Sequence, residues 1–116
     1  MHEMSLMEST LTMVRDLASK EQMTRITEVC LGVGELSGAM PDALRFAFEA
    51  LTKVDTYAMF RGATLTIQWE EAVALCSNCG ASYHPDRKIL LCPECSLPTG
   101  KLIQGENLQV LYFEGE

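Results

Sequence analysis

The chain is poor in basic residues, and this limits the partners that it can bind. Its 116 residues include nine Lys and Arg against sixteen Asp and Glu, which gives a net charge of −7. A surface that binds nucleic-acid phosphates needs clustered basic side chains. Near the cysteine-rich part of the sequence only Arg87, Lys88 and Lys101 are available. The composition therefore disfavours DNA and RNA and favours a protein or a cationic partner.

Long apolar segments are missing as well. No run of about 18 apolar residues occurs, so the sequence predicts no membrane-spanning helix and no membrane partner. Residues 1–25 lack the continuous apolar stretch of a signal peptide, and free thiols then favour the reducing cytoplasm. An apolar content of 47% indicates one small globular core, or such a core with a metal-held appendage.

What the sequence does contain is a pair of CxxC motifs in its C-terminal half. Cys76 and Cys79 form the first motif and Cys92 and Cys95 the second, with twelve residues between them. Two such turns can place four sulfurs around one ion, and zinc prefers soft ligands in a tetrahedron. Because four thiolates leave no position for water or substrate, we predict a structural Zn(II). Two disulfides or a redox pair are the alternatives, and they would need an export signal or a single CxxC at a helix start.

The spacing of apolar residues predicts an α+β fold in which two helices pack on a three-stranded sheet. Two segments show the period of a helix and three the period of a strand. In chain order these are residues 5–20, residues 25–33, a helix that begins at Pro41, residues 64–70 and residues 108–113. Ser5 and Glu8 are expected to form a capping box at the start of the first helix.

The strand patterns also predict the surroundings of single residues. Cys30 is expected to be a small buried hydrophobe. The segment Gly32-Val33-Gly34 is expected to open a turn, because the further residues of a phosphate-binding loop are absent. Trp69 is expected in the core or on a sheet face. Glu70 and Glu71 are expected at a solvated strand end, with side chains on opposite faces.

The position of the cysteines predicts how the chain is divided. The last strand is expected to return to the main sheet, which makes the cysteine segment an insertion between two adjacent strands. Residues 1–72 and 103–116 then form the α+β domain, and residues 73–102 form a zinc-binding module. A short strand is expected inside the module, from Lys88 to Leu91.

The amino terminus offers a second set of metal ligands. The imidazole of His2, its own backbone nitrogen and the amine of Met1 can close fused chelate rings around one ion. Once the amide ionises, these donors favour a square-planar ion such as Ni(II) or Cu(II) over tetrahedral zinc. Glu3 adds a carboxylate, or a backbone nitrogen as a fourth donor.

These features occur together in an order that resembles one known family. The terminus Met1-His2-Glu3-Met4-Ser5, the segment Gly32-Val33-Gly34-Glu35 and the two CxxC motifs are similar to the HypA/HybF family of nickel-insertion accessory proteins for NiFe hydrogenase, some of which also serve urease. The resemblance covers essentially the whole chain. It implies a metallochaperone that binds Ni(II) as transient cargo at Met1, His2 and Glu3 of a nickel-binding α+β domain. It also implies structural Zn(II) at the four paired cysteines.

The resemblance further implies the partners. A GTPase accessory protein of hydrogenase maturation and the hydrogenase large subunit are the expected ones, and a homodimer stays open. The chain departs from some members of the family in one respect, because Ala81 and Ser96 stand where those members have histidines beside the cysteines. This departure weakens an extension to urease. His84, inside the zinc loop, is expected to be a solvated surface residue.

Two other functions are less consistent with the residues. A zinc-ribbon adaptor for transcription or translation would need more Lys and Arg around the cysteines. An enzyme would need converging catalytic groups, and no paired Ser, His or Cys arrangement occurs, so no catalytic residue is assigned. The candidate acids are scattered along the chain: Glu3, Glu35, Glu70 and Glu71.

Overall fold

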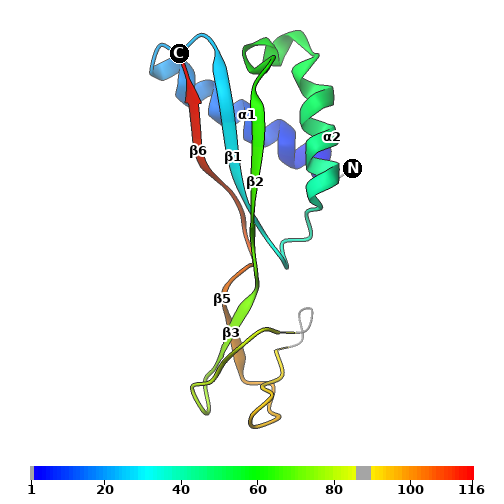
Figure 1. Ribbon diagram of the computed structural model, residues 1–116, viewed down its shortest axis with the longest axis vertical. Helices are drawn as coiled ribbons and strands as arrows, with labels where there is room; N and C mark the ends of the chain where they lie inside the picture. Colours follow the sequence, from blue (N-terminus) through cyan, green and yellow to red (C-terminus); the bar gives the residue numbers. More distant parts are fainter. Residues whose placement is uncertain (1, 86–89) are drawn as a thin grey trace.

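The computed structural model describes residues 2–85 and 90–116, which form two small sheets placed one beyond the other along the longest axis (Figure 1). The main sheet has the strand order β2-β1-β6, and the smaller sheet has the order β4-β3-β5. The molecule measures 54 × 27 × 17 Å along its principal axes. The elements are α1 (His2–Lys20), β1 (Ile26–Gly34), α2 (Pro41–Thr52), the 3-10 helix η1 (Asp55–Phe60), β2 (Thr64–Glu70), β3 (Val73–Cys76), β4 (Ser82–Tyr83), β5 (Gly100–Gln104) and β6 (Leu108–Gly115).

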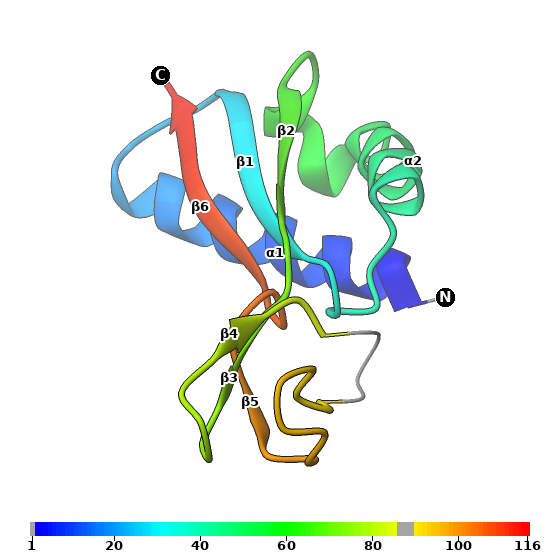
Figure 2. The same ribbon diagram turned by 60° about the horizontal axis from the view of Figure 1, so that its bottom comes forward.

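The main sheet is mixed, and the helices lie on one side of it. The central strand β1 pairs in parallel with β2 and antiparallel with β6. Figures 1 and 2 show α1 crossing behind the sheet and α2 packed beside it. The core between helices and sheet includes Met7 and Leu11 of α1, Leu44 of α2 and Leu31 of β1. This arrangement confirms the predicted α+β fold with two helices on a three-stranded sheet.

Helix α1 begins at His2 and not at Ser5, so the predicted capping box is wrong. The earlier start has a tertiary cause. Met4 packs against the core, and Oε2 of Glu3 accepts a hydrogen bond from the N–H of Met40 (3.3 Å) just before α2. Burying apolar surface of Met4 stabilises an additional helical turn that a local capping pattern does not reveal.

Helix α2 begins at Pro41, as predicted. Proline suits the first turn because its φ angle is already helical and the missing N–H has no intrahelical partner there. The buried side chains of α2 follow the spacing of one helix face: Leu44, Ala47, Phe48 and Leu51.

Strand β1 is buried along most of its length, and Val29, Leu31 and Val33 belong to the core under the helices. Cys30 is fully buried there, as expected for a small hydrophobe. The predicted turn at Gly32-Val33-Gly34 is wrong, because these residues complete β1 and the turn begins at Glu35. A Cβ atom at Gly32 would lie 3.2 Å from the side chain of Leu111 in β6. Glycine therefore lets Leu111 close over the strand.

The smaller sheet continues from the end of the main sheet. β3 follows β2 directly, and β5 leads into β6, which returns to the main sheet as predicted and pairs there with β1. The expected insertion between adjacent strands needs a correction, because β1 lies between β2 and β6. The most apolar strand takes the centre, where both of its edges are hydrogen-bonded. The proposed domain boundaries at residues 72 and 103 stay a prediction.

Three further observations concern single segments. Trp69 lies at the end of β2 with 51% of its surface exposed, so it is not a core residue. Of the strand predicted from Lys88 to Leu91, the first two residues lie outside the described part of the chain and the last two belong to no strand. In residues 2–85 and 90–116, no helix combines the length and the apolar character that crossing a membrane requires.

Candidate metal centres

The structure brings the four paired cysteines together at the far end of the smaller sheet. Their sulfur atoms all lie within 4.8 Å of one another. The Sγ atoms of Cys76 and Cys95 are 3.6 Å apart, as are those of Cys79 and Cys92. Sulfurs bound at about 2.3 Å to a tetrahedral zinc ion are about 3.8 Å apart, whereas a disulfide bond is about 2.05 Å long. The donor set therefore fits one tetrahedral ion and does not fit disulfides.

Two equivalent turns position these sulfurs. The N–H of Gly80 donates to the carbonyl of Cys76 (2.9 Å), and the N–H of Ser96 donates to the carbonyl of Cys92 (2.8 Å). The residue that follows each motif has a left-handed backbone, with φ of 77° at Gly80 and 57° at Ser96. This conformation ends each turn and suits glycine, which stands there only after the first motif. The repeated geometry directs both pairs of sulfurs toward the same point.

The thiols influence each other's protonation strongly. The Thr99 hydroxyl, together with the N–H of Cys79, lowers the pKa of Cys76 to about 6. The N–H of Ala81 lowers the pKa of Cys79, but the nearby sulfurs of Cys76 and Cys92 raise it more, to about 11. One thiol in the cluster thus ionises readily and opposes ionisation of its neighbour. A divalent cation among the sulfurs would remove this conflict, because it stabilises all four thiolates at once.

The amino-terminal residues belong to the main-sheet part of the molecule, away from the cysteines at the far end of the smaller sheet (Figures 1 and 2). Met1 lies outside the described residues, while His2 is exposed and Glu3 half-buried in the first turn of α1. The first four N–H groups of a helix have no intrahelical acceptor, so ionising the amide of His2 breaks no helical hydrogen bond. The carboxylate of Glu3 is already in contact with the N–H of Met40.

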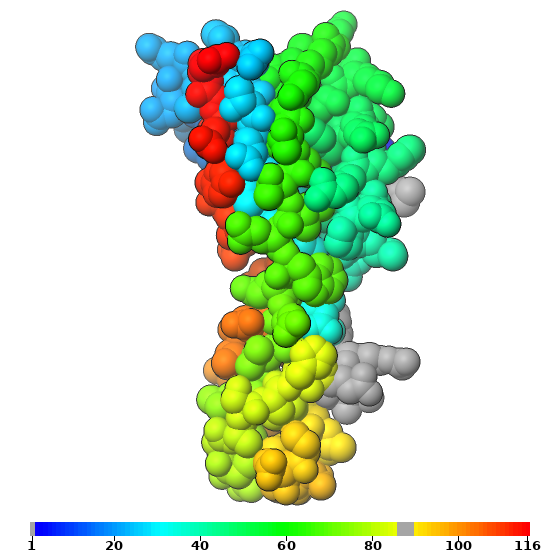
Figure 3. All heavy atoms as spheres, in the orientation of Figure 1, coloured from blue at the N-terminus to red at the C-terminus, as the bar shows by residue number. Residues whose placement is uncertain are grey.

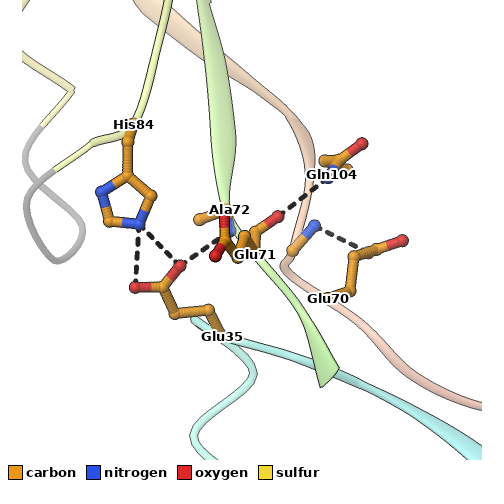
Figure 4. A network of polar contacts seen from close by, with 7 residues as sticks. Glu35, Glu70, Glu71, Ala72, His84 and Gln104 are labelled. Atoms are coloured by element: carbon orange, nitrogen blue, oxygen red, sulfur yellow. Dashed lines mark hydrogen bonds and ion pairs between the residues drawn. The ribbon is translucent and has the colours of Figure 1, made fainter. Parts of the chain in front are cut away.

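Glu35, in the turn after β1, connects the two sheets (Figure 4). Its Oε1 accepts a hydrogen bond from the N–H of Ala72 (2.8 Å) and lies 2.8 Å from Nε2 of His84. The same ring nitrogen is 3.0 Å from Oε2 of Glu35. Ala72 lies between β2 and β3, and His84 follows β4. One carboxylate therefore contacts both the connection and the smaller sheet. The prediction of a solvated His84 missed this contact, although the side chain is 56% exposed.

Main-chain contacts strengthen the same junction. The N–H of Glu35 donates to the carbonyl of Glu70 (2.8 Å), and the N–H of Leu36 donates to that of Gly105 (2.7 Å). The side chain of Glu70 accepts a hydrogen bond from the N–H of Gly105 (2.8 Å). Sequence reasoning assigned no role to Glu35, and its place beside Gly34 in the family-like segment was the one available signal.

We expect replacement of Glu35 to change how the protein responds to acid. The N–H of Ala72 and the ring of His84 hold the pKa of Glu35 below its ordinary value of 4.5. A carboxyl whose pKa falls on folding adds stability above its unfolded pKa and loses that contribution as pH falls through the folded pKa. Glu35→Gln keeps an acceptor oxygen but no charge. It should lower the thermal midpoint at neutral pH and flatten the decline below about pH 4.5.

Circular dichroism melts between about pH 7 and about pH 3 measure this difference. Acid would also remove a metal held by the thiols, from the Glu35→Gln variant and from the unmodified chain alike. The thermal midpoints of the two proteins are therefore compared at each pH. Glu106→Gln, which neutralises an exposed carboxylate in the turn before β6, is the matched control and should follow the unmodified profile. Parallel profiles for Glu35→Gln and the unmodified chain would contradict the prediction.

Comparison with known proteins identifies relatives along the whole chain. The family model described as "Hydrogenase/urease nickel incorporation, metallochaperone, hypA" matches residues 1–115. Hydrogenase maturation factor HypA from Syntrophus aciditrophicus is 38% identical over 115 residues, which are 98% of both chains. Hydrogenase maturation factor HypA from Bradyrhizobium sp. (strain ORS 278) is 35% identical over 116 residues, which are 100% of both chains.

Solved structures share the fold. The solution structure of the Ni metallochaperone HypA from Helicobacter pylori has a TM-score of 0.69 at 24% identity and covers 97% of this chain and 96% of its own. A second solution structure, of a HypA protein, has a TM-score of 0.74 at 26% identity and covers 100% of this chain and 97% of its own. With a family match over nearly every residue and the fold in common, the chain belongs to the HypA family of nickel metallochaperones for hydrogenase maturation.

Proposed function

We propose that this protein binds Ni(II) at its amino terminus and delivers it for the maturation of NiFe hydrogenase. The observation that carries the proposal is the family match over residues 1–115, which includes the terminal residues with metal-binding chemistry. The exposed position of His2 at the start of α1 is consistent with a cargo site that a partner protein can reach. A metallochaperone of this kind binds and releases its ion without catalysing a reaction.

The proposed nickel donors are the amine of Met1, the backbone nitrogen and imidazole of His2, and either the carboxylate or the backbone nitrogen of Glu3. The positive end of the α1 dipole favours an ionised amide nitrogen at this position. Oε2 of Glu3 already accepts a hydrogen bond from Met40, so nickel binding through that oxygen would compete with this contact. Few and exposed donors permit release of the ion, whereas a closed cage would retain it.

The proposed role of the second site is structural. Cys76, Cys79, Cys92 and Cys95 would hold Zn(II) with every coordination position filled by sulfur. The distances between the sulfurs and the two equivalent turns support this assignment. Zinc would supply no chemistry at this site beyond fixing the two turns together.

The proposed partners follow from family membership. We infer that a GTPase accessory protein and the hydrogenase large subunit receive or regulate the nickel, and that the exchange takes place in the cytoplasm. The net charge of −7 favours a partner with basic residues at its docking surface.

Calorimetric titration with Ni(II) tests the nickel site. We expect His2→Ala, and separately one residue added before Met1, to weaken nickel binding by at least about tenfold, because each change removes or displaces a chelating nitrogen. Ser5→Ala, an exposed change in the same part of α1, is the control and should bind as the unmodified chain does. Affinity should also fall at acid pH, since the amine, the amide and the imidazole must lose protons to bind. Unchanged affinity in both altered proteins would reject the site.

A further inference from the structure

A cavity of about 370 Å³ opens at the waist of the molecule, where the main sheet meets the smaller one. Gly32 of β1 and Leu111 of β6 contribute to its lining, together with the end of β2 and Glu71 just beyond it. Figure 3 shows the face of the main sheet on this side, where the red, cyan and green strands lie uncovered by any helix. Helix α1, which carries His2 and Glu3, lies on the other side of the sheet (Figure 1). The cavity is therefore separate from both candidate metal centres.

The two large apolar residues that line this waist pocket are Trp69 and Leu111. Trp69 is the single tryptophan of the chain, and 51% of its surface is exposed although tryptophan is costly to leave in water. Leu111 is 44% exposed and lies over Gly32, where an added Cβ would be 3.2 Å from the leucine side chain. An exposed tryptophan beside a cavity is typical of a residue that anchors a partner.

The polar part of the pocket is acidic, and the carboxylate of Glu70 within it is held in position. Glu70 and Glu71 contribute to its lining, and among its described residues none is Lys, Arg or His. Glu70 accepts a hydrogen bond from the N–H of Gly105 (2.8 Å), and the amide of Gln104 donates to the carbonyl of Glu71 (3.0 Å) (Figure 4). These contacts hold the carboxylate and the amide at the rim before any ligand arrives.

This combination selects the chemistry of a ligand. An anion would be repelled by the two carboxylates, and a wholly apolar group would cover polar side chains without pairing them. A guanidinium group is planar, stacks on an indole ring and donates several hydrogen bonds to carboxylate and amide oxygens. The volume is at the lower end of ligand-sized cavities, which suits one long side chain.

We propose that the waist pocket binds an arginine side chain of a partner protein. The guanidinium stacks on Trp69 and pairs with Glu71, while its aliphatic part lies along Leu111. Charge is the reason for choosing a basic partner. The chain has a net charge of −7, and the pocket contains two of its acidic residues with no basic residue in the described lining. Docking here leaves the amino terminus accessible.

The single tryptophan makes the proposal directly measurable. The probe is the peptide acetyl-Gly-Arg-Gly-amide, titrated to about 10 mM into the full-length protein while the fluorescence of Trp69 is recorded. We expect a saturable change in emission. The same peptide with citrulline, which has the shape of arginine without its charge, should bind at least about tenfold more weakly.

Two variants that remove the same charge test whether Glu71 binds the arginine side chain. Glu71→Gln should weaken binding of the arginine peptide about tenfold, whereas Glu21→Gln, which removes the same charge beyond the end of α1, should leave it unchanged. Both side chains are exposed, so neither change is expected to unfold the protein. The proposal is overturned if the arginine peptide gives no saturable signal, if citrulline binds equally well, or if the two variants behave alike.

Discussion

Replacing Cys92 by serine is expected to abolish the proposed metal binding and to unfold the segment around the cysteines while the main sheet stays folded. The smaller sheet has almost no apolar core of its own, since the buried side chains within residues 73–85 and 90–104 are Ala74, Cys76, Pro85 and Cys92. The main core, in contrast, unites side chains from both helices and from the strands of the main sheet. A structural zinc site can contribute about 10–16 kcal/mol, far more than this small cluster could by apolar burial.

Hydrogen exchange combined with native mass spectrometry can show whether the cysteine segment unfolds while the main sheet stays folded. In Cys92→Ser the amides of Gly80 and Ser96, which close the two turns, should exchange rapidly, while amides within β1 stay protected. The mass of one zinc ion should disappear from the native spectrum. The matched control is Cys30→Ser, the same chemical change at the buried cysteine of β1, which should keep the metal. Retention of metal by Cys92→Ser, or its loss from Cys30→Ser, would refute the assignment of ligands.

The helices and the cysteine cluster were predictable because their signals are local. The stripe of α2 needs only the helical period, and Pro41 marks its start. Each CxxC turn is likewise encoded within a few residues, so the convergence of the sulfurs follows from two short motifs. Features of this kind depend little on the rest of the chain.

The errors arise where distant segments meet. The sequence of Gly32-Val33-Gly34 resembles a turn because nothing nearby shows that Leu111 and Gly105 approach these glycines closely. The start of α1 was misplaced because Met4 gains its stability from the core and not from a capping pattern. Glu35 and His84 are 49 positions apart in the sequence, and no periodic pattern of residues predicts that they are in contact. Tertiary contacts decide all three cases.

Adding one methyl group at Gly34 is expected to destabilise the junction between the sheets severely. A Cβ atom there would lie 2.5 Å from the C and O atoms of Gly105 and 2.9 Å from the carbonyl oxygen of Asn107. These are main-chain atoms, so no side-chain rotation relieves the overlap, and β1 must move away from the segment before β6. We expect Gly34→Ala to lower the free energy of unfolding by about 3 kcal/mol and the thermal midpoint by about 15 °C.

Gly62→Ala is the control that distinguishes the steric overlap at Gly34 from the general cost of replacing a glycine. Gly62 has a φ of 81°, and nothing lies within 4 Å of its added Cβ, so only the left-handed backbone opposes the change. That strain costs about 1 kcal/mol, and the melting temperature should fall by correspondingly less. Equal losses for the two variants would show that the approach of Gly34 to Gly105 carries no special weight.

The crowding at Gly34 and the carboxylate of Glu35 should also act as one unit. Moving β1 away from Gly105 displaces the next residue, Glu35, from the N–H of Ala72 and the ring of His84. Once Gly34→Ala has opened the junction, the contacts of Glu35 are already weakened, so Glu35→Gln removes less stabilisation. The double variant should therefore lose less stability than the sum of the two single losses. Strictly additive losses would mean that the glycine contact and the carboxylate link hold the two sheets together independently.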